Sequence, residues 1–265
     1  MTSSMTANQD LDHAFTLADT ADVISTSYFH STKLIVTTKP DATPVTQADT
    51  EVEQALSNLV KSYGEGYVGE EGARAQAKSS KHWIVDPIDG TKNFMRGMPV
   101  WATLIGLYDG TTPLVSVVSA PALGKRWWAT KDGGAWTRDV DGHVRQLHVS
   151  EVTEISNAFL LISSLFAWDK TMVGTAVMLE LLKSVWRERA VGDFWGHMLV
   201  AEGAADVSCE PAVKSWDVDS LRLIVTEAGG SVWTNDTPKT LPEESRAVIS
   251  SNGKLEAAVR TALRL

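Results

Sequence analysis

The second half of the chain alternates short apolar segments with longer amphipathic ones, and this alternation restricts the fold more than any other feature. Strands are predicted at residues 159–162, 185–187, 205–209 and 231–233. Helices are predicted at residues 171–183, 194–202, 217–227 and 254–263. Strands that alternate with helices are typical of α/β proteins, in which the helices cover the faces of a sheet. We therefore expect an α/β half over residues 151–265.

The first half has a different pattern. Apolar residues at helical spacing predict a helix over residues 8–29, and a second helix follows Thr46 and Asp49, which can form a capping box. Two apolar runs separated by the turn YDGTTP predict a β-hairpin, at residues 100–107 and 114–118. We expect an α+β half over residues 1–150, packed with the second half as one compact unit.

Charge and cysteine content exclude several classes of protein. The 265-residue chain has a formal charge of -9, whereas a nucleic-acid-binding surface needs a basic stripe. Its single cysteine, Cys209, allows no internal disulfide and fits a reducing cytoplasm. No run approaches the roughly 20 apolar residues that cross a bilayer, and the N-terminus lacks the features of a signal peptide. We expect a cytoplasmic protein that binds neither nucleic acid nor membrane.

The segment WIVDPIDGTKNF, residues 83–94, carries the densest chemical signal. Its pattern predicts that an apolar strand ends at Asp86, that Pro87 stops it, and that a helix opens at Gly90 just after Asp89. Two carboxylates beside a helix N-terminus suit cations that face a phosphate group. In isolation the same pattern is more often an ordinary turn, with the second aspartate as an N-cap.

Two further acidic clusters favour the metal site over the ordinary turn. The motif GEEG places Glu70 and Glu71 at another strand end, and SWDVDS places Asp217 at another helix start. With EAGG at residues 227–230, these motifs resemble, in this order, the signatures of the inositol monophosphatase superfamily. The resemblance extends from about residue 10 to the C-terminus. DPIDGT is highly specific to that family, whereas GEE or WD alone is a weak signal.

The resemblance implies a fold, a cofactor and an assembly. The fold is a layered α/β/α/β/α sandwich, with metal ions at the junction of the two halves, and the usual assembly is a homodimer. The cofactor is Mg²⁺, with two or three ions in each site. The implied metal ligands are four carboxylates and one backbone carbonyl, those of Glu70, Asp86, Asp89, Asp217 and Ile88. Such hard oxygen donors are the ones that Mg²⁺ prefers.

The resemblance also implies catalytic residues. Asp49 matches an early acid that lies near the attacking water together with Thr91. A role for Asp49 in the capping box has about equal weight, and both roles can hold if the cap lies beside the site. We expect the Thr91 hydroxyl, linked to Glu70 or Asp49, to orient the water, while Glu71 supports the site without binding metal. Cys209 lacks the arginine six residues later that a cysteine phosphatase needs, and no P-loop motif is present.

The substrate pocket is expected around VGDFWGH, residues 191–197, where the family contacts the leaving alcohol. Asp193 replaces a small neutral residue, and Glu210 matches another family contact. Two acids there suit a substrate with an amine or imidazolium group. Gly90, Thr91 and Lys92 complete the predicted substrate-binding set. The alternative for Asp193 is a helix cap. His197 lies one helical turn later; it could edge the pocket, but we expect it at the surface.

Within the family, DGTKNF, the GDF segment and PVWATLIGL resemble the actinobacterial histidinol-phosphate phosphatase branch. This resemblance implies Mg²⁺-dependent hydrolysis of L-histidinol phosphate, a small-molecule phosphate monoester, in histidine biosynthesis. Two alternatives within the class are inositol-1-phosphate and fructose-1,6-bisphosphate as substrates. An alternative from another class is a non-catalytic relative that binds or regulates a partner. Loss of a motif carboxylate would favour that alternative, and all of them are present.

Overall fold

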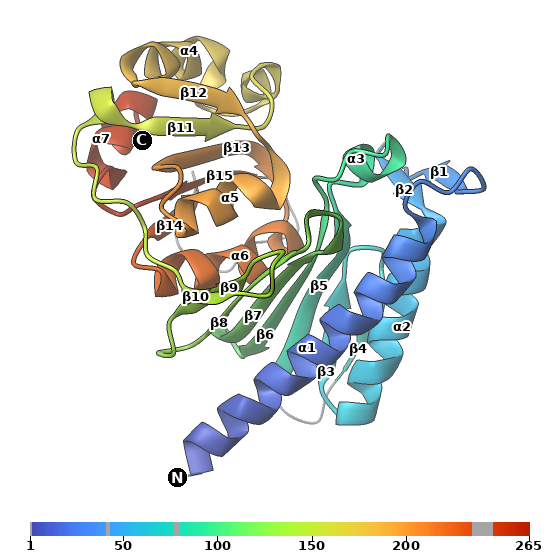
Figure 1. Cartoon of the computed structure of the whole chain (residues 1–265). Coiled ribbons are helices and arrows are strands. Elements are labelled where there is room, and N and C mark those ends of the chain that lie inside the picture. Colours follow the sequence, from blue (N-terminus) through green and yellow to red (C-terminus); the bar gives the residue numbers. More distant parts are fainter. Residues whose placement is uncertain (1, 41–42, 77–79, 235–245) are drawn as a thin grey trace.

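The larger of the two main sheets has eight strands. The computed structural model describes residues 2–40, 43–76, 80–234 and 246–265. The strand order of this sheet is β10-β9-β8-β7-β6-β5-β3-β4 (Figure 1). Its strands are β3 (Gly66–Gly69), β4 (Arg74–Ala75), β5 (Lys81–Asp89), β6 (Ala102–Asp109), β7 (Thr112–Ala120), β8 (Lys125–Thr130), β9 (Ala135–Arg138) and β10 (Val144–Gln146). The predicted hairpin is confirmed as β6 and β7, which pair in antiparallel fashion.

The smaller sheet comes from the second half and has the strand order β12-β11-β13-β15-β14. Its strands are β11 (Phe159–Ile162), β12 (Arg187–Ala190), β13 (Val207–Val213), β14 (Ser231–Thr234) and β15 (Arg246–Ser251). A separate two-stranded ribbon joins β1 (Val36–Thr38) and β2 (Pro44–Thr46). The helices are α1 (Thr2–Tyr28), α2 (Gln47–Tyr63), α3 (Thr91–Met95), α4 (Gly174–Ser184), α5 (Asp193–Ala201), α6 (Ser215–Glu227) and α7 (Glu256–Leu263).

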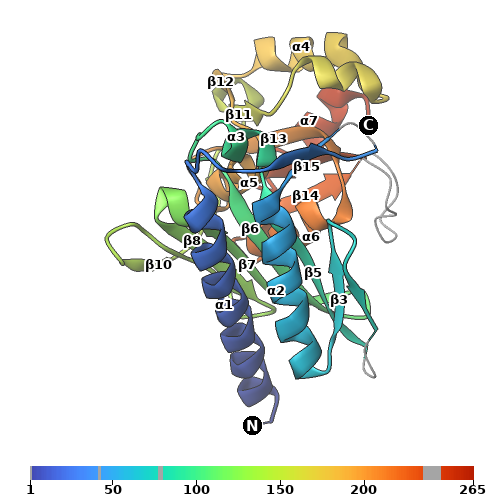
Figure 2. The same ribbon diagram turned by 90° about the vertical axis from the view of Figure 1, so that its right-hand side faces the viewer.

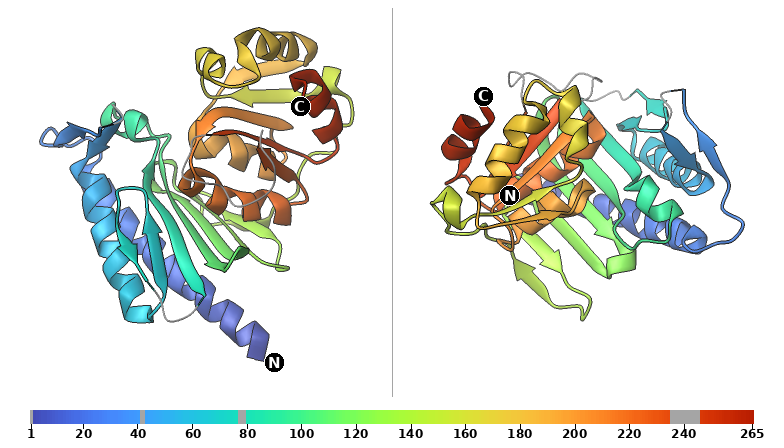
Figure 3. Two further views of the ribbon diagram at one scale, coloured as in Figure 1. Left: turned by 180° about the vertical axis from the view of Figure 1, so that it is seen from behind. Right: turned by 90° about the horizontal axis from the view of Figure 1, so that it is seen from above.

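The helices and sheets form five layers (Figures 1 and 3). Helices α1 and α2 lie side by side on the outer face of the larger sheet (Figure 2), where Leu17 and Val52 pack against Trp83. Helices α5 and α6 fill the space between the sheets, and their apolar side chains share one core with both sheets. Helices α4 and α7 cover the outer face of the smaller sheet. The predicted α/β/α/β/α sandwich is therefore confirmed.

The middle position of β5 explains its apolar sequence. The strand has α2 on one face and α6 on the other, so residues 83–88 are all buried. A strand covered on both faces has a continuous apolar run instead of an alternating one.

One expectation about strands is wrong, and two strands were not predicted. Strand β5 does not stop at Pro87 but continues to Asp89, because a register shift between Asp86 and Asp89 interrupts its pairing with β6 at that point. A β-bulge leaves a residue unpaired and therefore tolerates a proline, which has no N–H to donate. Strands β9 and β15 were not expected; β15 is short and polar at both ends, and its pairing with β13 and β14 holds it in place.

No helix in the described part of the chain combines the length and the apolar composition needed to cross a membrane.

Candidate active site

The bulge in β5 brings Asp86 and Asp89 to the same side of the sheet. Residues three apart in a regular strand point to opposite faces. Here Asp86 pairs with Leu104 and Asp89 with Ala102, so three steps along β5 match two along β6. The one extra residue restores a common direction for the two side chains. The motif DPID thus places both carboxylates at one point.

Asp217 joins this pair from the first turn of α6. Its carboxylate accepts a hydrogen bond from the backbone N–H of Lys214 at 2.8 Å, which fixes the side chain at the helix start. Asp86, Asp89 and Asp217 each offer one oxygen, and these oxygens lie within 4.8 Å of one another. Three converging carboxylate oxygens fit the donor set of a hard divalent cation.

Burial and mutual repulsion raise the pKa of each acid in this cluster. Burial raises the pKa of Asp217 to about 7, with further effects from the charges of Glu70 and Glu210. Burial also raises the pKa of Asp86 well above its ordinary value, followed by the charge of Glu70. The pKa of Asp89 rises in the same direction for the same first reason. Buried like charges at this density need a cationic partner if all are to be ionised.

Glu70 lies at the end of β3 and faces the same cluster, since its charge acts on both Asp86 and Asp217. Lys39, beside the two-stranded ribbon, contacts Glu70 at 2.9 Å and Glu71 at 2.7 Å. The ammonium group thereby balances part of the charge of the two glutamates. Lys39 could not be predicted from the sequence, because 31 residues separate it from Glu70.

Glu53 of α2 holds the turn that carries Glu70. Its buried carboxylate accepts the backbone N–H groups of Glu71 at 2.8 Å and Ala73 at 2.7 Å. A Cβ on Gly69 would lie only 2.1 Å from this carboxylate, so the position requires glycine. Glu53 is four residues from Asp49 and therefore lies on the same face of α2. This spacing could have predicted that Glu53 lies near the site.

The two carboxylate oxygens of Asp49 make different contacts, one in the capping box and one with Thr91. Oδ2 accepts the backbone N–H of Thr46 at 2.8 Å in a capping box, as the sequence predicts. Oδ1 accepts the hydroxyl of Thr91 at 3.3 Å. Burial raises the pKa of Asp49 to about 6. The Thr91 link therefore runs to Asp49, and the described hydrogen bonds include none between Thr91 and Glu70.

Ile88 and Gly90 complete the backbone part of the site. The carbonyl oxygen of Ile88 lies 3.0 Å from the Thr91 hydroxyl, and its N–H donates to Asp86 Oδ1 at 3.0 Å. Gly90 has a φ of +83°, and a Cβ there would lie 2.9 Å from the carbonyl oxygen of Val100. Only glycine fits this junction between β5 and α3.

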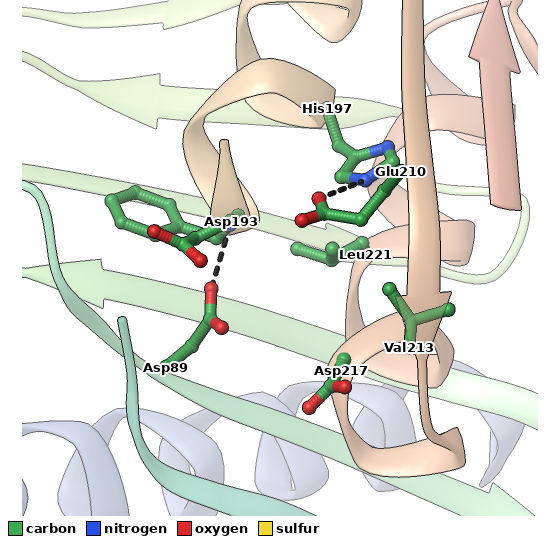
Figure 4. A pocket seen from close by; sticks show the side chains of 8 residues that line it. Asp89, Asp193, His197, Glu210, Val213, Asp217 and Leu221 are labelled. Atoms are coloured by element: carbon green, nitrogen blue, oxygen red, sulfur yellow. Dashed lines mark hydrogen bonds and ion pairs between the residues drawn. The ribbon is translucent and has the colours of Figure 1, made fainter. Parts of the chain in front are cut away.

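A pocket that is partly open to solvent adjoins the acidic cluster (Figure 4). It is lined by Asp89, Asp193, Phe194, His197, Glu210, Val213, Asp217 and Leu221. The structure therefore brings the two predicted substrate acids, Asp193 and Glu210, into one pocket with two predicted metal ligands.

Asp193 does not cap α5 with its side chain, so the capping alternative is wrong. The N-cap is Gly192, and the N–H of Phe194 donates to Asp89 Oδ2 at 2.6 Å. Asp193 instead adopts a left-handed φ of +58° and accepts a hydrogen bond from Asn93 at 2.8 Å. Burial, followed by the charge of Glu210, raises its pKa to about 7, while the positive charge of Lys92 opposes the rise. A strained aspartate in a pocket indicates a functional constraint.

His197 is not at the surface. Its side chain is 2% exposed and lies in the pocket wall between β13 and β15. The expectation fails because α5 is enclosed by both sheets, so even its polar side chains are covered.

The pKa shifts predict how pH and Mg²⁺ affect stability. The native pKa of Asp217 is about 7 against an ordinary 3.8, so between these values the native state binds a proton that the unfolded state releases. The free energy of unfolding of the cation-free protein will therefore fall as pH rises toward about 7. Mg²⁺ competes with protons for the same oxygens. At about 10 mM it will raise the Tm by about 5 °C at pH 8 and by less at pH 6.

Differential scanning calorimetry at both pH values measures this difference. NaCl at equal ionic strength is the control for screening. An equal Mg²⁺ effect at the two pH values, or the same effect in Asp217→Asn, would contradict the assignment.

Comparisons with known proteins agree with the order of the motifs. The model of the inositol monophosphatase family matches residues 7–264. The chain is 43% identical over 260 residues to a histidinol-phosphatase from Mycobacterium tuberculosis, with 97% of this chain and 98% of that protein covered. It is also 43% identical over 253 residues to a histidinol-phosphatase from Streptomyces coelicolor, covering 93% of both.

Solved structures support the fold alone. The extragenic suppressor protein suhB from Bartonella henselae aligns with a TM-score of 0.83 at 23% identity, over 97% of this chain and 98% of that one. An IMPase from Thermotoga maritima aligns with a TM-score of 0.82 at 23% identity, over 97% of both chains. The family match over nearly the whole length confirms the resemblance carried by the acidic motifs. This chain belongs to the inositol monophosphatase family.

Proposed function

We propose that the chain is a Mg²⁺-dependent phosphatase that hydrolyses L-histidinol phosphate to L-histidinol and phosphate. The observation that carries this proposal is the pair Asp193 and Glu210, which line one pocket with Asp89 and Asp217. The histidinol-phosphatases that share 43% of its residues over nearly its full length support the same substrate.

The number of acids favours a cationic substrate. The cluster of Glu70, Asp86, Asp89 and Asp217 supplies the carboxylates proposed for the metal ions, and Lys39 contacts Glu70. Asp193 and Glu210 are additional, and each is covered from solvent for most of its area. A carboxylate that is poorly solvated is stabilised by a positive group in contact with it. The amine or imidazolium of histidinol provides such a group, whereas inositol offers only hydroxyls.

The residues present fit the metal that the family implies. We propose that Glu70, Asp86, Asp89, Asp217 and the carbonyl of Ile88 hold two or three Mg²⁺ ions. When bound, Mg²⁺ supplies charge neutralisation for the phosphate and lowers the pKa of a water.

The protein groups around the metal site orient the attacking water and accept its proton. The Thr91 hydroxyl donates a hydrogen bond to Asp49 Oδ1 or to the Ile88 carbonyl. The hydroxyl oxygen of Thr91 can therefore accept a hydrogen bond from the attacking water. Asp49 has a pKa of about 6, which suits acceptance of that proton near neutral pH. We propose that the backbone N–H groups from Gly90 to Lys92 bind phosphate oxygens, since the first N–H groups of a helix have no acceptor within it.

Phosphate release tests the function. The purified protein should be assayed with histidinol phosphate, inositol-1-phosphate and fructose-1,6-bisphosphate, each with Mg²⁺ and with EDTA. We expect Mg²⁺-dependent turnover with the highest kcat/KM for histidinol phosphate. A preference for inositol-1-phosphate would reassign the substrate, in line with the 32%-identical inositol monophosphatase 1 of Bos taurus. Failure to hydrolyse any monoester would support the alternative of a non-catalytic binding protein.

Asp193→Asn tests the substrate pocket separately. The substitution retains the acceptor for Asn93 and removes the charge that faces the pocket. We expect kcat/KM for histidinol phosphate to fall by about 30-fold, in the range for loss of a charged contact, with inositol-1-phosphate hydrolysis unchanged within about threefold. Steady-state kinetics on both substrates measures the ratio, and an equal loss on both would contradict the assignment.

We also propose a cytoplasmic homodimer. The large apolar side chains of Phe166, Met172 and Trp186 are exposed close to α4 and β12. Strand β12 lies at the edge of the smaller sheet. Exposed apolar groups beside a sheet edge are typical of an interface between subunits. Light scattering of the purified protein measures the mass and tests the dimer.

The proposed cytoplasmic location is supported by the single cysteine, which is unpaired and buried and fits a reducing compartment.

A further inference from the structure

We propose that His197 and Ser250 are positioning residues that aim the Glu210 carboxylate into the substrate pocket and thereby set the preference for a cationic leaving group. This inference rests on the proposed function, which assigns the pocket to an amine-bearing alcohol. It adds two residues that act through Glu210 without contacting the reacting phosphate.

The three side chains come from three different elements that meet behind the pocket. His197 lies on α5, Glu210 on β13 and Ser250 on β15. His197 Nδ1 is 2.6 Å from Ser250 Oγ, and His197 Nε2 is 3.6 Å from Glu210 Oε2 (Figure 4 shows the second contact). Ser250 is fully buried, so its hydroxyl has no exchange with solvent. The imidazole thus connects a fixed hydroxyl to a carboxylate at the cavity wall.

The contacts with Ser250 and Glu210 together decide which ring nitrogen of His197 carries a hydrogen. If the serine hydroxyl donates to Nδ1, the neutral ring carries its hydrogen on Nε2. If the ring is protonated, both nitrogens carry hydrogen. The remaining tautomer would point the Nε2 lone pair at a carboxylate oxygen, which is repulsive. In each favourable state an N–H of His197 therefore faces Glu210.

Glu210 needs this support because little else holds it. Its side chain is 12% exposed, and the described part of the chain provides no hydrogen bond to its carboxylate. A Cβ added to Gly192 would lie 3.9 Å from the other oxygen of Glu210, Oε1, which is van der Waals distance and provides no hydrogen bond. A flexible glutamate loses rotamer freedom when it binds a ligand. Contact with His197 removes part of that cost before the substrate arrives, which is preorganisation.

Different residues contact the two acids of the pocket. Asn93 on α3 donates a hydrogen bond to Asp193, whereas His197 on α5 contacts Glu210 on β13. Asp193 and His197 are four residues apart, so α5 presents both on one face. Two independently held carboxylates can contact a cationic group from two directions. A neutral alcohol can hydrogen-bond to these carboxylates but forms no ion pair with them.

Two substitutions distinguish positioning from a purely structural role. His197→Asn keeps a donor and acceptor near Ser250 and removes the group that faces Glu210. His197→Gln keeps an N–H at the distance of Nε2. We expect His197→Asn to raise the KM for histidinol phosphate about fivefold, the order of a lost charge contact that is longer than a hydrogen bond, with kcat within about twofold. His197→Gln should recover most of the loss, and the KM for inositol-1-phosphate should change in neither variant.

Asp206→Asn is the matched control for a buried polar contact elsewhere. Asp206 accepts the backbone N–H of Phe159 at 2.6 Å, and the pocket lining does not include it. We expect this variant to lower the Tm without changing the ratio of the two KM values. If His197→Asn also lowers only the Tm, or raises both KM values equally, the positioning role is wrong.

A double-mutant cycle with Glu210→Gln separates this inference from the proposed function. If His197 acts through Glu210, His197→Asn will add less than about twofold to the KM once Glu210 is neutralised. Wild-type protein that shows no preference for histidinol phosphate would overturn the proposed function. The cycle would then be measured on the best monoester substrate, where additive effects of the two substitutions would overturn the coupling itself.

Discussion

Replacing Asp217 with asparagine will lower kcat/KM for phosphate release by about 10³-fold, equivalent to about 4 kcal/mol of transition-state stabilisation. Asparagine keeps an oxygen that can accept the N–H of Lys214, so the start of α6 is retained. What it loses is one negative charge among three oxygens that lie within 4.8 Å of one another. Fewer charges hold the cation less tightly, so the Mg²⁺ concentration for half-maximal activity will rise as well.

Asp219→Asn provides a control on the same helix. Burial raises the pKa of Asp219 to about 6, so it is also a poorly solvated acid. The converging set of Asp86, Asp89 and Asp217 does not include it. We expect its substitution to change kcat/KM by less than about threefold. Steady-state assays across a Mg²⁺ titration compare the two variants. Comparable losses in both would mean that the effect comes from α6 as a whole and not from a metal ligand.

The acids of the site could be predicted from the sequence, but the way they converge could not. Asp86 and Asp89 stand three apart, and in a regular strand that spacing separates them. The proline between them indicates a strand end, whereas the structure uses it inside a bulge that turns both carboxylates to one side. Pairing with β6 decides this outcome, and pairing between strands is not written in the local sequence.

Contacts between residues close in sequence were easier to predict than contacts between distant ones. The capping box of Thr46 and Asp49 depends on a spacing of three residues and is confirmed. By contrast, Asn93 reaches Asp193 across 100 residues, and His197 reaches Ser250 across 53. A single histidine on a mostly apolar helix does not indicate which face is covered. The layer of helices between two sheets decides that, and it forms only when both halves of the chain have folded.

The hydroxyl of Thr91 should be the second most important group after the metal ligands. It lies 3.3 Å from Asp49 Oδ1 and 3.0 Å from the Ile88 carbonyl, so both neighbours fix its direction. Valine has nearly the same shape and lacks the hydroxyl. We expect Thr91→Val to lower kcat by about 100-fold, the typical contribution of a group that positions or relays a proton, with KM within about threefold. Thr91→Ser, which retains the hydroxyl, should recover most of the activity.

A loss in kcat at constant KM separates this role from simple binding, because removal of a contact made equally in the ground and transition states would raise KM instead. Thr137→Val is the matched control, since that buried hydroxyl also donates to a backbone carbonyl, that of Arg126 at 3.1 Å. The Thr137 variant should lose stability and keep its kcat. If Thr91→Val raises KM while kcat is unchanged, the hydroxyl contacts the substrate and does not orient the water. The link from Thr91 to Asp49 would then serve the capping of α2 alone.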